Sequence, residues 1–62
     1  MKWRINLMDE DNNEWKGTKI YTSHRALMRD YNAEMNDTTE TYIDDNLIIG
    51  AFIEELPDDF EG

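Results

Sequence analysis

Residues 2–8 carry the pattern that most restricts the fold of this sequence, because apolar and polar side chains alternate there one by one. The apolar members are Trp3, Ile5 and Leu7. A period of two is typical of a β-strand with one buried face, and such a strand needs both a pairing partner and a cover for that face. We therefore expect a sheet with another element packed on one side.

A second strand is predicted from about Glu14 to Thr22, where aromatic and β-branched residues are concentrated. Residues 9–13 precede it and contain only turn-forming side chains. Gly17 is expected to mark a bulge where the alternation of the second strand slips. The two strands should form an antiparallel hairpin with an acidic loop.

A helix is predicted over residues 24–36, after Thr22 or Ser23 as the N-cap. Its apolar residues recur at helical spacing, and they are Leu27, Met28, Tyr31 and Met35. At 1.5 Å per residue, this helix would be roughly 20 Å long. That length is enough to cover a small sheet.

The last strand is predicted over residues 47–53, the most apolar segment of the chain, and residues 40–43 are a candidate for a short extra strand. The predicted fold class is α+β: a small antiparallel sheet of three or four strands, in the order β-β-α-β, with one helix on one face. Residues 1–55 would form the single domain, and residues 56–62 a flexible acidic tail.

Neither a metal nor a cofactor is expected. The chain has no cysteine, and its single histidine has no second one to pair with. The run Asp9-x-Asp11-x-Asn13 begins like a calcium-binding loop, but Glu14 stands where the loop requires glycine and Ile20 where it requires an acid. No apolar run approaches the ~20 residues of a membrane span. The N-terminus does not resemble a signal peptide, so we expect a cytoplasmic protein.

Charge is divided unevenly along the chain. Residues 1–29 hold all six Lys and Arg residues and four acids, whereas residues 30–62 hold eleven acids and no Lys or Arg. The net charge of −9 repels nucleic acid and anionic lipid, so direct binding to either is not expected. A basic protein is the expected partner.

The acids of the predicted helix are arranged against its stability. Asp30 and Glu34 are like charges one turn apart, and the acids lie toward the C-terminal end, where the helix dipole disfavours them. Residues that break such rules often serve a function. The acids that we expect to contact the partner are Asp30, Glu34, Asp37, Glu40, Asp44 and Asp45.

The predicted last strand is apolar on both of its faces, although a single helix can cover only one of them. Ile48 and Phe52 would share the second face. They would be covered by the tail, by a second copy of the protein or by a partner. We therefore add these two residues to the expected binding surface.

An enzyme is not expected. The adjacent acid pairs lie in segments that should be wet, and a domain of this size has little room for a cleft that encloses a substrate. The favoured hypothesis is an inhibitor that mimics phosphate charge. It would occupy the basic groove of a nucleic-acid enzyme, such as a nuclease, a CRISPR effector, a restriction enzyme or RNA polymerase. Small acidic proteins of that kind are typical of phages and mobile elements, so the host cytoplasm would be its location. The alternative is a self-associating or adaptor module that uses the apolar last strand, with a homodimer as one form.

Overall fold

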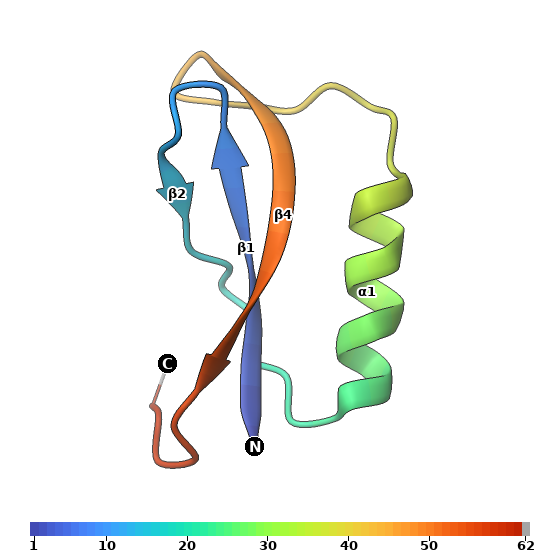
Figure 1. The fold of residues 1–62 in the computed structure, drawn as a ribbon, viewed down its shortest axis with the longest axis vertical. Coiled ribbons are helices and arrows are strands. Elements are labelled where there is room, and N and C mark those ends of the chain that lie inside the picture. Colours follow the sequence, from blue (N-terminus) through green and yellow to red (C-terminus); the bar gives the residue numbers. More distant parts are fainter. Residues whose placement is uncertain (62) are drawn as a thin grey trace.

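The computed structural model describes residues 1–61 and contains one helix and a four-stranded antiparallel sheet. The strands are β1 (Lys2–Asp9), β2 (Glu14–Trp15), β3 (Tyr42–Ile43) and β4 (Asn46–Leu56), and the helix α1 covers His24–Asn36. The sheet order is β2-β1-β4-β3, so the two long strands are central, and α1 runs alongside β4 (Figure 1). The predicted α+β class is confirmed, and the short extra strand lies within residues 40–43.

The alternation in β1 sets the two faces of the sheet. Ile5 lies opposite Ile53 and Leu7 opposite Ala51, on the side that faces α1. At one end of this face the rings of Trp3 and His24 meet edge to face, with centroids 5.7 Å apart. The apolar members of the alternating pattern are thus the ones that the helix partly covers.

Helix α1 begins and ends as its sequence predicts. The hydroxyl of Ser23 accepts a hydrogen bond from the backbone N–H of Ala26, which makes Ser23 the N-cap. Leu27 is only 1% exposed and is the centre of a small core that also includes Tyr21 and Leu56. No helix within residues 1–61 has the length and apolar character needed to cross a membrane.

The second strand is shorter than predicted. Only Glu14 and Trp15 pair with β1, and the chain then leaves the sheet until Tyr21, whose backbone exchanges two hydrogen bonds with Trp3. Between these points, the backbone N–H of Gly17 donates to the side-chain oxygen of Asn6 at 3.2 Å. A side chain therefore replaces the backbone acceptor that a continuous strand would use. Gly17 thus lies outside the paired strand, and the bulge predicted there is not formed: the strand ends at Trp15 instead.

The last strand is longer than predicted and ends at Leu56. It continues through Glu54 because the carboxylate of Glu54 binds two side chains of β1, as described below. The chain then turns back, and the carbonyl of Phe60 accepts from Nζ of Lys2 at 2.8 Å. Leu56, predicted to begin the tail, is a buried strand residue, and Gly62 lies outside the described residues.

Candidate functional site

One end of the sheet gathers exposed acids from two distant parts of the sequence. The β1–β2 loop and the β3–β4 turn meet there, and the backbone N–H of Glu10 donates to the carbonyl of Leu47 at 2.9 Å. Tyr42 lies near acids of both segments. Its hydrogen bond to Glu40 and, to a smaller extent, the nearby charge of Glu10 raise the pKa of Tyr42. We call this surface the acidic end, and it consists of Glu10, Asp11, Glu14, Glu40, Asp44 and Asp45.

The buried carboxylate of Asp9 holds the acidic end together. It accepts hydrogen bonds from the indole Nε1 of Trp15 at 2.9 Å and from the side-chain amides of Asn13 at 3.1 Å and Asn46 at 3.2 Å. Burial alone would raise the pKa of Asp9, but these hydrogen bonds outweigh it and bring the pKa to about 2. One ionised group therefore fixes the β1–β2 loop to the start of β4.

The turn between β3 and β4 places two aspartates side by side in an uncommon conformation. The φ angles of Asp44 and Asp45 are 51° and 67°. A two-residue hairpin turn with positive φ at both central positions favours Asn-Gly. Two adjacent acids are therefore disfavoured at this turn by both conformation and charge. Both side chains are exposed, and neither forms an ion pair with Lys or Arg within residues 1–61.

Two carboxylates away from this end bind four of the six basic side chains. Glu54 accepts from Nε of Arg4 at 2.9 Å and from Nζ of Lys16 at 3.0 Å. Hydrogen bonds from Arg4, then from Asn6 and Lys16, lower the pKa of Glu54 to about 2.

Asp30 is the second of these carboxylates. It accepts from the hydroxyl of Tyr21 at 2.7 Å, from Arg29 at 3.1 Å and from Lys19 at 3.4 Å. The hydrogen bond from Tyr21, followed by that from Arg29, lowers the pKa of Asp30 to about 2. Asp30 is one of the acids expected to contact a partner, and in the structure its carboxylate already binds Tyr21, Arg29 and Lys19 of the same chain.

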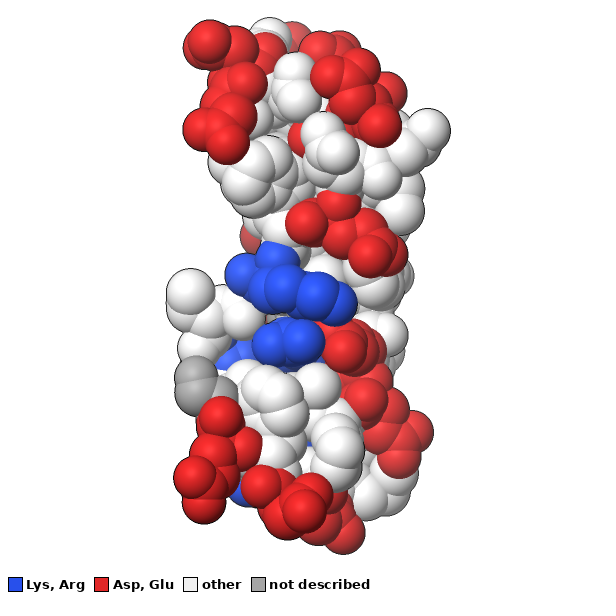
Figure 2. Space-filling view, turned by 90° about the vertical axis from the view of Figure 1, so that its left-hand side faces the viewer, with Lys and Arg blue, Asp and Glu red and all other residues white. Residues whose placement is uncertain are grey.

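The charges consequently form bands along the molecule, which is 33 Å in its longest dimension. Figure 2 shows Lys and Arg in a belt across the middle of one face, with acids above and below it. The second acidic region lies at the opposite end and includes Glu55, Asp58, Asp59 and Glu61, of which Asp58 pairs with the N-terminal amine at 3.0 Å. The acidic end has no comparable partner within residues 1–61.

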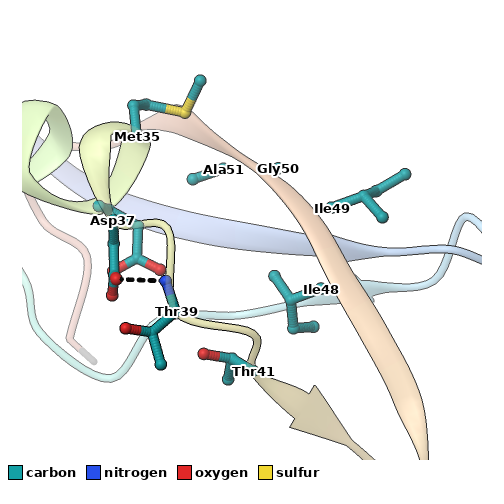
Figure 3. A pocket seen from close by; sticks show the side chains of 9 residues that line it. Met35, Asp37, Thr39, Thr41, Ile48, Ile49, Gly50 and Ala51 are labelled. Atoms are coloured by element: carbon teal, nitrogen blue, oxygen red, sulfur yellow. Dashed lines mark hydrogen bonds between the residues drawn. The ribbon is translucent and has the colours of Figure 1, made fainter.

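Three of the predicted contact residues lie together at the C-terminal end of α1. Glu34, Asp37 and Ile48 line a cavity of about 120 Å³ between the helix end and β4 (Figure 3). Asp37 accepts from the backbone N–H of Thr39 at 2.8 Å, and this bond lowers its pKa. Glu40, Asp44 and Asp45 belong to the acidic end instead.

The prediction that Ile48 and Phe52 share one face of the last strand is wrong. A register shift between Met8 and Asp9 leaves Ile49 without a partner in β1, so Ile48 lies opposite Asp9 and Phe52 opposite Asn6. The extra residue reverses the side of the strand on which each later side chain lies. Ile48 is directed toward the helix side, and Phe52 lies on the open face.

Sequence reasoning missed Glu10 and Asp11, because residues 9–13 are typical of a solvated hairpin loop, and it missed Glu14, because that residue was expected to begin the second strand. The pairing of β1 with β4 is what places this loop beside Asp44 and Asp45. An available signal was the long apolar last strand, which needs a long antiparallel partner, and residues 2–8 are the best candidate.

Within residues 1–61, no group of three or more His, Asp or Glu side chains is arranged to hold a metal ion. Comparison of the chain with protein-family models, with curated proteins and with solved structures finds no match. Any functional assignment therefore depends on the chemistry of the surfaces described above.

Proposed function

We propose that this protein binds a basic partner protein of the nucleic-acid-handling class, with carboxylates of the acidic end taking the positions of phosphate groups. The observation that carries this proposal is the distribution of ion pairs. Glu54 and Asp30 bind four of the six basic side chains, and no ion pair within residues 1–61 involves an acid of the acidic end. A concentration of uncompensated negative charge steers a positively charged partner and favours its binding.

The rigidity of the acidic end supports the same proposal. Its two backbone segments are joined by the bond from Glu10 to Leu47 and by the contacts of Asp9 with Trp15 and Asn46. Charges held in a fixed arrangement lose less conformational entropy when a partner binds than charges on a mobile tail. Binding should weaken as the salt concentration rises, as in a protein–DNA complex. Removal of carboxylates from the acidic end should lower the affinity and make its dependence on salt less steep.

Affinity capture from a bacterial lysate with matched charge variants tests this function. One variant neutralises the acidic end (Glu10→Gln, Asp11→Asn, Asp44→Asn, Asp45→Asn), and the other neutralises the opposite end (Glu55→Gln, Asp58→Asn, Asp59→Asn, Glu61→Gln). Each change removes four charges from the net −9, so the two variants have the same net charge. Asparagine at residues 44 and 45 tolerates the positive φ angles.

The proposal expects capture of a basic nucleic-acid-binding protein at low salt, its release by high salt or by duplex DNA, and loss of capture only in the acidic-end variant. Equal capture by both variants, or capture that DNA does not displace, would contradict it.

A second candidate function is self-association through β4. Strand β3 pairs with only Asn46 and Leu47, and Ile48 donates to Thr41, so within residues 1–61 no strand pairs with the outer edge of β4 beyond Ile48. Ile49, at the start of this edge, is 60% exposed. An open edge can add a strand from another chain. Sedimentation equilibrium tests this candidate, and a monomer at high protein concentration would rule it out.

A further inference from the structure

A groove of about 620 Å³ lies between the second half of α1 and the sheet. Its apolar floor consists of Ile5, Leu7, Trp15 and Ile43, which are only half-buried. These residues include the inward members of the β1 alternation, the positions that a covering helix normally seals from water. The helix-facing side of the sheet is therefore closed near Leu27 and open farther along.

The sequence of α1 explains why the groove is open. The buried residue Leu27 comes from the first half of the helix. In the second half, the residues that line the groove are Asp30, Ala33 and Glu34, followed by Asp37 after the helix end. Ala33 is small and the other three carry charge, while the large apolar residues of this half, Tyr31 and Met35, are not among the residues that line the groove.

The two walls of the groove differ in their free charge. Lys16 and Lys19 lie on the wall formed by the β2–α1 connection, but Lys16 is paired with Glu54 and Lys19 with Asp30. Glu34 and Asp37 on the helix wall have no ion pair within residues 1–61. The uncompensated charge of the groove is negative.

An apolar floor beside free carboxylates matches one kind of side chain. Arg and Lys have long aliphatic stems that pack on apolar surface and charged ends that seek an anion. The flat indole of Trp15 suits an arginine especially, because guanidinium groups stack on aromatic faces.

We propose that the groove receives an Arg or Lys side chain, flanked by an apolar residue, from a partner protein. The stem and the apolar neighbour lie on the floor, and the charged end pairs with Glu34 and Asp37. This inference rests on the proposed function, because a basic partner supplies the side chain. It adds a second contact, distinct from the acidic end.

Titration of the ¹⁵N-labelled full chain with capped peptides tests the groove by NMR. The probe is Leu-Arg-Phe-Arg, and the controls are Leu-Glu-Phe-Glu, which reverses the charge, and Ser-Arg-Ser-Arg, which lacks the apolar residues. The indole N–H of Trp15 reports on the groove, and that of Trp3, beside His24, serves as the internal reference. We expect a saturable shift of the Trp15 signal with Leu-Arg-Phe-Arg and weaker responses to both controls.

Two variants connect the shift to the groove. Ala33→Met fills the groove and should abolish the response of Trp15, whereas Asn32→Met adds the same side chain at an exposed position of α1 outside the groove and should preserve it. Glu34→Gln with Asp37→Asn should raise the Kd about tenfold through the loss of two partly exposed ion pairs. A thermal melt of each variant verifies that it is folded.

The inference is overturned if Leu-Glu-Phe-Glu binds as well as the basic probe, if no peptide shifts Trp15, or if Ala33→Met binds normally. Failure of the inference is distinguishable from failure of the proposed function. If Ala33→Met still captures the basic partner in a salt-dependent way, the acidic end acts without the groove. If the peptide binds the groove but the acidic-end variant captures the basic partner as well as the opposite-end variant does, the groove inference is supported and the proposed phosphate mimicry is contradicted.

Discussion

The indole N–H of Trp15 and the carboxylate of Asp9 form a 2.9 Å hydrogen bond in which the acceptor is completely buried. This contact joins the two surfaces that we propose to bind a partner. Trp15 contributes to the floor of the groove, and Asp9 fixes the loops of the acidic end. A change at Asp9 should therefore disturb both surfaces at once.

Asp9→Ala should destabilise the fold, because five hydrogen-bond donors lose their acceptor and several of them are shielded from water. Asp11→Ala, an exposed acid two residues away, is the matched control and should leave stability nearly unchanged. Urea unfolding of both variants measures the difference. Similar midpoints for the two variants would show that Asp9 does not hold the loops.

Stability should fall as the solution is acidified toward pH 2. The pKa values of Asp9, Asp30 and Glu54 are each about 2 in the folded protein and near 4 in an unfolded chain. A group with a lowered folded pKa stabilises the fold fully above its unfolded pKa, and this contribution disappears as the pH falls through the folded pKa. The loss should therefore occur between about pH 5 and pH 2.

Asp30→Asn provides the control for this pH dependence. Protonation of the other acids also changes charge repulsion, but that effect is common to wild type and variant. The difference between the two urea-derived free energies should shrink as the pH falls toward 2. A difference that stays constant from pH 7 to pH 2 would contradict the assigned pKa of Asp30.

The turn variant Asp44→Asn with Asp45→Gly should be more stable than the wild type by about 1 kcal/mol, because it supplies the residues that this turn conformation favours. The same change removes two charges from the acidic end and should weaken partner capture. Thermal melts and the capture assay give the two results. Higher stability with undiminished binding would remove Asp44 and Asp45 from the binding surface.

Gly17→Ala should destabilise the protein by about 2 kcal/mol, because a Cβ at this position would collide with the carbonyl oxygen of Ile5. Gly50→Ala is the matched control, since nothing lies within 4 Å of a Cβ at that residue. Urea midpoints measure both effects. If the two substitutions cost the same, the close approach of Gly17 to β1 is not needed for stability.

Local sequence patterns predicted the elements whose causes are local. Helix α1 spans the predicted residues 24–36 because its cap, Ser23, and its apolar period lie within the segment itself. The second strand was overextended because Asn6, a residue of the neighbouring strand, binds Gly17 in place of the backbone. The end of the last strand was missed because Glu54 depends on Arg4, fifty residues earlier in the chain.

The sequence by itself determined the fold class, the bounds of the helix and the excess of negative charge, since each follows from residue types within short segments or from their sum. Only the tertiary structure decided which charges remain free. The carboxylate of Asp30 binds Tyr21 and two basic side chains near it. In contrast, Glu10 and Asp11 lie with Asp44 and Asp45 at one end of the sheet. The physical reason is that ion pairs and strand neighbours are set by distance in space, and the pairing of β1 with β4 brings together segments that the sequence keeps far apart.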